Sequence, residues 1–517
     1  MLSEPSVSNM SDAEISQPSC PNVADGSALI PAKRSWQYGI APHYIGLFLW
    51  VVFADRLGRT TLPIGGLGWS MLGAIVAALL CNELLFKGPA LWGQAADKTT
   101  IELAGRVFGT TGARLSGIVI GLGEIVWFAV ATGCATELSL DGLVACGLLS
   151  ENTLRPLVIG RTTFPPALFL FTSLFWSFAA ALTATWLIRI IGALMNAYPI
   201  FPAVVFAVTM LMLLPNLRTF APTGIDPIDG RYMPEGRGTL LALLRMVQLI
   251  FGFFAMAGVL SADWGKASES ARDVRLGGWV GVVLAPTVVA AIALMTVAGY
   301  QGKVAPRFAT DEGPEPGVVR RSTSRSTIIE QEPAKPPTLL VRDAIKIGIG
   351  GRMSGAMLLV LGLASLAPAV YASFTYAHRF KEAVGGLSRI AWMLVATVFA
   401  WPLMATGLVA NLEGVFFVMG AVFAPMAAAY SALASRDKRA WTGPRAGINP
   451  SGAIGWACGT VVGLLPILAP EPVSRLQPAA LWAFLTAYVV TRVFASIGWE
   501  SRKIEPSTAA SDATSSV

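Results

Sequence analysis

Long apolar segments alternate with short polar loops along most of this 517-residue chain. A helix needs about 20 consecutive apolar residues to cross the ~30 Å hydrocarbon core of a membrane. Twelve segments approach that length, so we expect twelve membrane helices. Their approximate bounds are 38–57, 62–86, 115–137, 165–188, 195–214, 243–263, 277–300, 354–377, 390–409, 415–433, 451–468 and 479–497. The apolar run 139–149 is too short to span and is expected to be a loop or an interfacial piece.

The polar stretches separate one membrane domain, residues 33–498, from segments of different character. Residues 1–32 are rich in Ser, Pro and Asp and lack the apolar core of a signal peptide, which predicts a disordered cytoplasmic tail. Within the domain, residues 301–335 are rich in Pro, Ser and Arg and are expected to form a disordered loop insertion. Residues 499–517 are expected to form a second disordered cytoplasmic tail.

The composition supports an all-α polytopic membrane protein. Only 13% of the residues are charged, against about 25% in soluble proteins, and 54% are hydrophobic. The net charge of +7 comes mainly from Lys and Arg in loops, which membrane topology and anionic lipid explain without a nucleic-acid partner. The sequence contains no HExxH, Cys/His cluster or GxxxxGK[ST] loop, so we expect no metal site, no cofactor and no enzyme activity.

The distribution of basic residues predicts the orientation. Several Lys and Arg follow the sixth, eighth and tenth segments, whereas the loop after the ninth has none. Positive charge favours the cytoplasmic side, which places both termini in the cytoplasm of a multi-pass protein of the cell (inner) membrane. The loop after the fifth segment, with Arg218, Arg231 and Arg237, counts against this orientation.

Two of the expected helices carry features of an interruption. The segment 249–267 contains Gly252 and Gly258, and glycine weakens a helix by about 1 kcal/mol relative to alanine. In hydrocarbon an interrupted helix is tolerated only where its freed backbone lines a cavity or packs on protein, and such a helix marks a transporter's binding site. The segment 44–66 is the expected counterpart, interrupted at 53–58. The alternative is two ordinary helices with glycines at packing contacts.

Glu124 and Trp127 are the strongest candidates for ligand binding. An ionisable group inside a membrane helix is costly and is a functional candidate by default. The two residues are three positions apart, so they lie on one helix face, where an aromatic plane and a polar group suit a flat heterocycle. Phe253 and Phe254 are candidates for a second aromatic wall. The alternative is an aromatic stripe packed on a neighbouring helix, with Glu124 paired to a basic residue.

Three further charged residues lie in or near these helices. Asp55 and Arg56 are expected either at the first interruption or at the extracellular end of that helix. At the interruption, Arg56 is a candidate partner for Glu124. Asp263 is expected to be a structural residue at the cytoplasmic end of the sixth segment.

Several motifs resemble one transporter family. Residues 252–264 and 123–128 look like the sixth and third helices of bacterial cytosine permeases, and 106–112 is similar to their Phe-Gly-x-x-Gly loop. Residues 417–432 and 441–463 resemble the tenth helix and the loop that starts the eleventh. The chain therefore resembles the nucleobase:cation symporter-1 family, which includes cytosine and purine permeases and the hydantoin transporter, over nearly the whole membrane domain.

This resemblance implies the five-plus-five inverted-repeat fold of the amino acid-polyamine-cation superfamily, with discontinuous helices 1 and 6, two added helices and alternating access. The family's substrate-binding positions fall on five residues of this chain. They are Phe53, Glu124, Trp127, Phe254 and Met256.

The chain departs from the family pattern where ligand and cation are bound. Cytosine permeases have glutamine at the position of Glu124 and serine at that of Met256, and a carboxylate donates no hydrogen bond unless protonated, so the ligand is not expected to bind as cytosine does. The segment 363–369 keeps one hydroxyl, that of Ser365, and no amide, which argues against a sodium site. We expect H⁺ rather than Na⁺ as the coupling ion, with Glu124, Asp55 and Ser365 as the cation-coupling candidates.

These features predict a secondary active transporter, a cation symporter that imports a nucleobase or related nitrogen heterocycle of the cytosine, purine, allantoin, hydantoin or thiamine class. Its expected partners are that small molecule and the lipid bilayer. Two alternatives keep the same fold. One is a transporter-like membrane receptor or sensor, and the other is an amino-acid transporter of the same superfamily.

Overall fold

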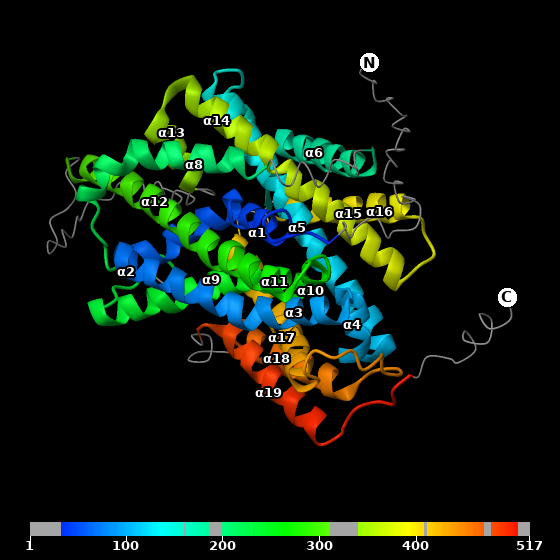
Figure 1. The fold of residues 1–517 in the computed structure, drawn as a ribbon. Coiled ribbons are helices and arrows are strands. Elements are labelled where there is room, and N and C mark those ends of the chain that lie inside the picture. Colours follow the sequence, from blue (N-terminus) through cyan, green and yellow to red (C-terminus); the bar gives the residue numbers. More distant parts are fainter. Residues whose placement is uncertain are drawn as a thin grey trace, which may run out of the picture.

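The computed structural model describes residues 33–159, 162–186, 198–228, 230–310, 340–407, 411–469 and 477–504. The expected tail 1–32 and most of the expected insertion 301–335 lie outside these residues, although 301–310 belong to a membrane helix. The described part is almost entirely helical (Figure 1). Its two strands, β1 (Leu157–Ile159) and β2 (Thr162–Phe164), pair as an antiparallel hairpin.

The helices follow one another in chain order with few long connections. They are α1 (Ile40–Phe48), α2 (Val51–Leu80), η3 (Cys81–Phe86), α3 (Lys87–Ala96), α4 (Thr100–Val107), α5 (Gly109–Ala145), η4 (Glu151–Leu154), α6 (Ala167–Trp186), α8 (Ile200–Leu213), η5 (Leu214–Thr219), α9 (Glu235–Val259), α10 (Ser261–Lys266), α11 (Ala271–Gly278), η6 (Trp279–Leu284), α12 (Ala285–Thr310), α13 (Leu340–Ile349), α14 (Gly351–Ala364), α15 (Leu366–Ala383), α16 (Arg389–Ala405), α17 (Leu412–Arg436), α18 (Pro450–Leu468) and α19 (Ala479–Ser496).

The membrane-spanning elements agree with the hydrophobic pattern. In the described residues, 10 helical runs are long and apolar enough to cross a membrane, and the shorter apolar α16 adds to them. The longest run, Val51–Ala96, bends at Gly66, whose φ of 64° suits a residue without a Cβ. The loop expected at 58–61, between the first two predicted helices, is therefore part of α2, and the kink lies inside the second predicted segment. Each of the twelve predicted segments overlaps a helix, and the multi-pass membrane fold is confirmed.

One expected loop is part of a helix. The run 139–149 was expected to lie outside the membrane helices, but α5 continues without interruption to Ala145. The extension packs on α14, where Gly142 faces Gly355 and Leu359, and Leu140 and Asp141 are buried. Packing on α14 buries this part of α5 and so stabilises a helical extension that the length of the apolar run did not predict.

The first and sixth membrane helices are discontinuous, as expected, but at different residues. Between α1 and α2 the chain is extended at Trp50, with ψ of 133°. Between α9 and α10 it turns at Leu260, with φ of −73° and ψ of −6°. The prediction that the first interruption lies at 53–58 is wrong, and Asp55 and Arg56 belong to the body of α2.

Gly252 and Gly258 do not break the sixth helix, so their assignment as the structural break is wrong. Both lie inside the continuous helix α9. A Cβ at Gly252 would overlap the carbonyl oxygen of Phe416, and one at Gly258 would lie 2.8 Å from the Cβ of Leu85. Each glycine permits a close helix–helix approach, which is the packing alternative left open by the sequence.

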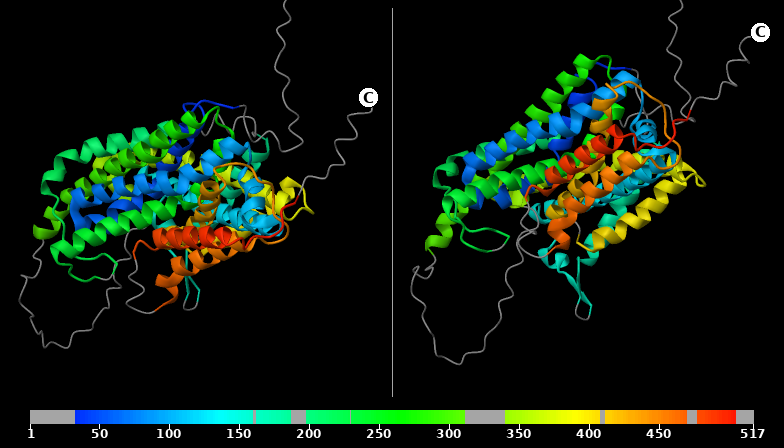
Figure 2. Two further views of the ribbon diagram at one scale, coloured as in Figure 1. Left: turned by 60° about the horizontal axis from the view of Figure 1, so that its bottom comes forward. Right: turned by 90° about the horizontal axis from the view of Figure 1, so that it is seen from below.

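The long helices form two packed groups around the interruptions. In one group α2 packs on α9 and α12, and in the other α5 packs on α14, α15 and α6. Helix α17 packs on α9, and α18 and α19 lie side by side along one edge of the bundle (Figures 1 and 2). Residues of α1, α5, α9 and α15, together with Trp50 and Leu260, line one cavity between these helices.

Residues 499–504 pack against the protein, which differs from the tail expected from residue 499 onward. The carboxylate of Glu500 pairs with the guanidinium groups of Arg106 at 3.0 Å, Arg436 at 2.8 Å and Arg445 at 2.8 Å. The main chain of Arg445 also forms a bridge with Lys503. The end of α19 is thereby tied to α4 and to the loop after α17.

Candidate binding cavity

A cavity of about 110 Å³ lies where the two interrupted helices face each other. It is lined by residues of α1, α5, α9, α10 and α15, and both interruption residues, Trp50 and Leu260, belong to its wall. A single water needs about 10–15 Å³ of such space, so the cavity has room for several waters or a small flat molecule.

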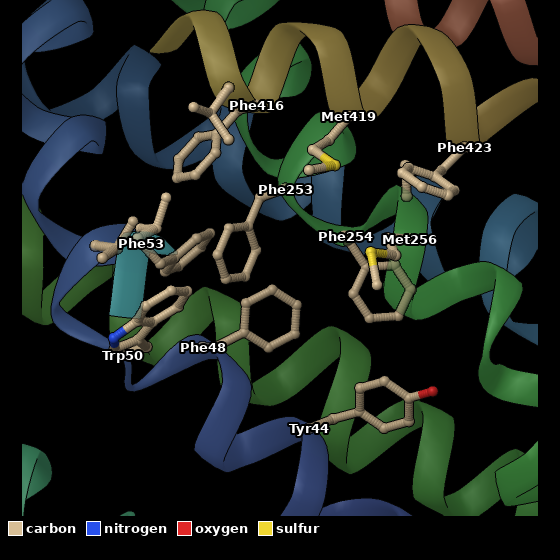
Figure 3. Packing of buried hydrophobic residues seen from close by; sticks show 14 of the residues in the cluster. Tyr44, Phe48, Trp50, Phe53, Phe253, Phe254, Met256, Phe416, Met419 and Phe423 are labelled. Atoms are coloured by element: carbon tan, nitrogen blue, oxygen red, sulfur yellow. The ribbon is translucent and has the colours of Figure 1, made fainter. Parts of the chain in front are cut away.

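Aromatic rings form one wall of this cavity. The ring centroids of Trp50 and Trp127 are 5.4 Å apart, and those of Trp127 and Phe253 are 5.3 Å apart. Phe253 also packs edge-on against Phe416 of α17, as Figure 3 shows. Flat apolar walls of this kind favour a flat ring over a flexible chain.

The face that α9 turns to the cavity follows helical spacing. Phe253, Met256 and Leu260 line it, and Trp264 continues the same face on α10. Phe254, one position along, points away and packs on Phe48, with centroids 5.7 Å apart and the rings inclined by 12° (Figure 3).

The five predicted binding residues divide into two sets. Glu124, Trp127 and Met256 line the cavity. Phe53 and Phe254 do not, since both are fully buried in the aromatic layer behind the cavity. In that layer the ring centroids of Phe53 and Phe253 are 5.0 Å apart. Trp50 and Phe253 occupy the wall in their place. The spacing 253, 256, 260 and 264 is the sequence pattern that distinguishes Phe253 from Phe254.

Glu124 is buried beside the cavity without a partner. Its side chain is 3% exposed, and among the described residues neither carboxyl oxygen has a hydrogen-bond partner. The expected pairing with Arg56 is wrong, because the Nε of Arg56 lies beside its neighbour Asp55, 3.6 Å from the carboxylate. The nearby Thr375 hydroxyl is within hydrogen-bond reach of the carbonyl oxygens of Tyr371 and Ala372.

Asp263 joins three elements next to the cavity. Its Oδ2 accepts a hydrogen bond from the guanidinium of Arg379 at 2.7 Å, and its Oδ1 accepts one from the backbone N–H of Thr100, also at 2.7 Å. These contacts tie α10 to α15 and to α4. The geometry suits the structural role expected for Asp263 and gives the positive charge of Arg379 a partner.

The three cation-coupling candidates are not brought together. Asp55 accepts a hydrogen bond from the backbone N–H of Val341, at the start of α13, at 2.8 Å. Ser365, between α14 and α15, donates to the carbonyl oxygen of Leu361 at 2.9 Å. Neither lines the cavity with Glu124. Among the described residues, no group of three or more His, Cys, Asp or Glu is arranged to hold a metal ion.

Residues from outside the predicted set complete the wall. The ring centroid of His43 lies 3.9 Å from that of Trp264 and 5.3 Å from that of Tyr371. The hydroxyl of Tyr198 donates to the carbonyl oxygen of Gly46 at 2.8 Å and so joins the end of α1 to the segment before α8. His43 was recognisable in the sequence as one of two histidines, but no pattern placed it in a site.

A second cavity, of about 390 Å³, lies beside α4, α5 and α15. Its wall includes Glu102 and Arg379. Burial by itself would raise the pKa of Glu102, but the backbone N–H of Thr99 and the ammonium groups of Lys98 and Lys266 lower that pKa to about 2. Glu102 also completes a capping box at the start of α4.

Comparison with known proteins identifies the fold. No family model and no curated protein matches the chain. The inward-facing conformation of Mhp1 aligns with 92% of this chain and 97% of its own, at 13% identity and a TM-score of 0.59. Mhp1, a nucleobase-cation-symport-1 family transporter, in a closed conformation with bromovinylhydantoin bound aligns with 91% of this chain and 96% of its own, at 13% identity and a TM-score of 0.57.

A third solved structure, MhsT in complex with L-phenylalanine, aligns with 90% of this chain and 98% of its own, at 14% identity and a TM-score of 0.52. At such identities the likeness concerns the fold. Over about nine-tenths of its length this chain therefore has the transporter fold of Mhp1, the discontinuous-helix fold that its sequence resemblance implied.

Proposed function

We propose that the protein is a secondary active transporter that carries a flat nitrogen heterocycle across the membrane by alternating access. The observation that carries the proposal is the cavity at the two helix interruptions, with an aromatic wall and one carboxyl group. An interrupted pair of helices at the centre of the membrane is where transporters of this architecture bind substrate. Mhp1, which has the same fold, is described with bromovinylhydantoin bound, and a nucleobase-like ring is the matching ligand class here.

The proposed coupling ion is the proton, and the proposed carrier is Glu124. In the described lining of the cavity, Glu124 is the one carboxylic acid. Ser365 contributes its hydroxyl to a helix carbonyl, and Asp55 holds the start of α13. The distribution of basic loops favours a cell-membrane protein with both termini in the cytoplasm. Net import of the ligand is the direction expected from the resemblance of the sequence to a permease family.

An amino-acid substrate fits the cavity less well. MhsT, with the same fold, is described with L-phenylalanine bound. An amino-acid ligand carries a carboxylate that needs a cation or several N–H donors. The described lining contains no Lys or Arg, and Arg379 nearby is already paired with Asp263. The aromatic wall, and the absence of Lys and Arg from the described lining, therefore favour a heterocycle.

The direct test is counterflow of a labelled heterocycle in proteoliposomes, with purines, pyrimidines, hydantoins, allantoin and thiamine as competitors. Trp127→Leu and Phe253→Leu keep apolar volume but remove aromatic faces, and we expect each to weaken binding about 10- to 100-fold, since one stacked ring contributes about 1–3 kcal/mol. Trp186→Leu, on a residue that is 79% exposed at the end of α6, is the matched control and keeps wild-type activity.

Two results contradict this proposal. If no compound of the panel binds or exchanges, the heterocycle assignment fails. If a compound binds but labelled ligand never exchanges across the membrane, the protein is a receptor rather than a transporter.

A further inference from the structure

Three hydroxyl groups in the wall around Glu124 already donate to backbone carbonyls, whereas the Nε1–H of Trp50 in the same wall has no hydrogen-bond partner among the described residues. The hydroxyl of Thr375 is directed to helix carbonyls of its own helix, and that of Tyr198 donates to the carbonyl of Gly46. The hydroxyl of Tyr44 donates to the carbonyl of Ala257 at 3.3 Å. Both carboxyl oxygens of Glu124 lack a hydrogen-bond partner among the described residues, so a negative charge here would be offset mainly by the guanidinium of Arg379, which is already paired with Asp263.

The protonation state of a carboxyl group decides which ligand edge it fits. A carboxylate offers two acceptors and fits two adjacent N–H donors, as in an amidinium. A neutral carboxylic acid offers one O–H donor and one acceptor. It therefore fits an edge on which an N–H stands next to an acceptor, and the two groups form a closed pair of hydrogen bonds.

Resting on the proposed function, we propose that Glu124 binds its substrate as the neutral acid, through an edge that carries one N–H beside one acceptor. The cis-amide edge of a hydantoin or uracil has this pattern, and so does the amino-imine edge of cytosine or adenine. The proton comes from water and stays on Glu124, whose O–H donates to the ligand's acceptor while the ligand's N–H donates to the other oxygen.

This arrangement explains coupling without a second ion site. The ligand binds well only when Glu124 carries a proton, and by linkage the proton binds better when the ligand is present. One proton therefore accompanies each ligand into the cavity. An amidinium ligand would have the opposite effect, because it would bind the carboxylate and release the proton.

Several other charged or titratable groups face Glu124 and need to be distinguished from it. Arg379 and Tyr371 lie on α15, Asp263 lies on α10, and His43 lies across the cavity on α1. The groups of α9 and α17 that face the preceding residue, Gly123, are the apolar Met256 and Phe423. Arg379 and Asp263 neutralise each other, which leaves His43 as the main competing source of pH dependence.

The test is calorimetric binding of the purified full-length protein at several pH values, in buffers of different ionisation enthalpy. Probes are hydantoin, uracil, cytosine and adenine for the donor–acceptor edge, and benzamidine for the two-donor edge. We expect no proton uptake at pH values where Glu124 is already neutral in the free protein. Where Glu124 is ionised before binding, we expect uptake of up to one proton per neutral ligand and a Kd that rises about tenfold per pH unit. Comparison of the cis-amide and amino-imine probes shows which of the two edges is bound.

The variant Glu124→Gln removes the titratable proton but keeps the size and the hydrogen-bonding pattern of the neutral side chain. Glutamine has the donor–acceptor pattern of the neutral acid, so the variant keeps affinity within about tenfold, which is the value of one neutral hydrogen bond. It loses both the proton uptake and the pH dependence. Glu137→Gln is the matched control, because Glu137 is also a glutamate of α5 with a buried, unpartnered Oε2 but does not line the cavity. We expect this control to keep the pH dependence.

Three outcomes overturn the inference while the proposed function stands. They are binding of neutral heterocycles with neither proton uptake nor a change of Kd at any pH tested, tighter binding of benzamidine with proton release, and loss of the pH dependence in His43→Gln but not in Glu124→Gln. Loss of all binding in Glu124→Gln, in a variant with unchanged thermal stability, also overturns it. Failure of the wild-type protein to bind any probe instead refutes the proposed function on which the inference rests.

Discussion

The ion pair between Asp263 and Arg379 is expected to be one of the strongest electrostatic contacts around the cavity. The guanidinium of Arg379 lies 2.7 Å from the Oδ2 of Asp263, and the two side chains are only 11% and 24% exposed. Two unit charges at about 4 Å attract each other by ~4 kcal/mol at an effective dielectric constant of ~20, and desolvation removes part of that gain.

Arg379→Gln should lower the free energy of unfolding by about 1–3 kcal/mol. Breaking a well-buried pair costs about 3–5 kcal/mol and breaking an exposed one about 0–1 kcal/mol, and this pair is intermediate because Asp263 is a quarter exposed. After the substitution, the carboxylate of Asp263 keeps the backbone N–H of Thr100 as its partner.

A double-mutant cycle with Asp263→Asn and Arg379→Gln measures the coupling directly, by reversible unfolding in mixed detergent. The pair Glu83–Lys87 is the matched control, since it has a similar distance of 2.8 Å but side chains 48% and 39% exposed. We expect a coupling near 0.3–0.5 kcal/mol for the control. If the coupling of the Asp263 pair does not exceed that of the control, the argument that burial strengthens the contact is refuted.

The remaining predictions concern packing, a surface helix and acid stability. Gly252→Ala should destabilise the protein by about 1–3 kcal/mol in thermal unfolding, because the new Cβ overlaps a carbonyl of α17, whereas Gly68→Ala, which meets nothing, should not. Asp141→Asn should speed hydrogen exchange in α13, because its carboxylate holds both Arg342 and Lys346; unchanged exchange would exclude that anchoring. Glu102 has a folded-state pKa of about 2, below its ordinary 4.5, so its stabilising contribution is present above pH 4.5 and lost as the pH falls toward 2. Glu102→Gln should therefore lower the melting temperature at pH 7 but not near pH 2, by an amount that corresponds to at most about 1 kcal/mol for this partly exposed group, and an equal effect at both values would contradict the assignment.

The hydrophobic pattern predicted the membrane helices well because their length is set by the bilayer. It did not locate the interruptions. Gly252 and Gly258 looked like helix breakers, but in a packed bundle the cost of a glycine is offset by the close approach it permits. The chain instead becomes extended at Trp50 and makes a tight turn at Leu260, residues with no intrinsic tendency to interrupt a helix. Tertiary contacts determine where these interruptions lie, so their positions cannot be predicted from the helix propensities of the residues.

In the candidate site too, the sequence predicted some residues correctly, whereas others depended on how the helices pack. The three-residue spacing placed Glu124 and Trp127 on one face, and both line the cavity. The choice between Phe253 and Phe254 depended on the rotation of α9 about its axis, and neighbouring residues on a helix point about 100° apart. The resemblance to a known family selected Phe254, whereas the helical spacing with Met256 and Leu260 selects Phe253.

The strongest argument for function is that Glu124, with both oxygens unpartnered, differs from most buried acids among the described residues. Asp263 is paired with Arg379, Asp141 with Arg342, Asp226 with Arg245, and Glu500 with Arg106. Each arrangement offsets the cost of removing a charge from water. Among the described residues, both oxygens of Glu124 are left without a hydrogen-bond partner, although a leucine of similar size would avoid that cost. A sequence selected for stability alone would not retain a carboxyl group there. Its place between the aromatic wall and the helix interruptions indicates that its partner is a molecule that arrives and leaves.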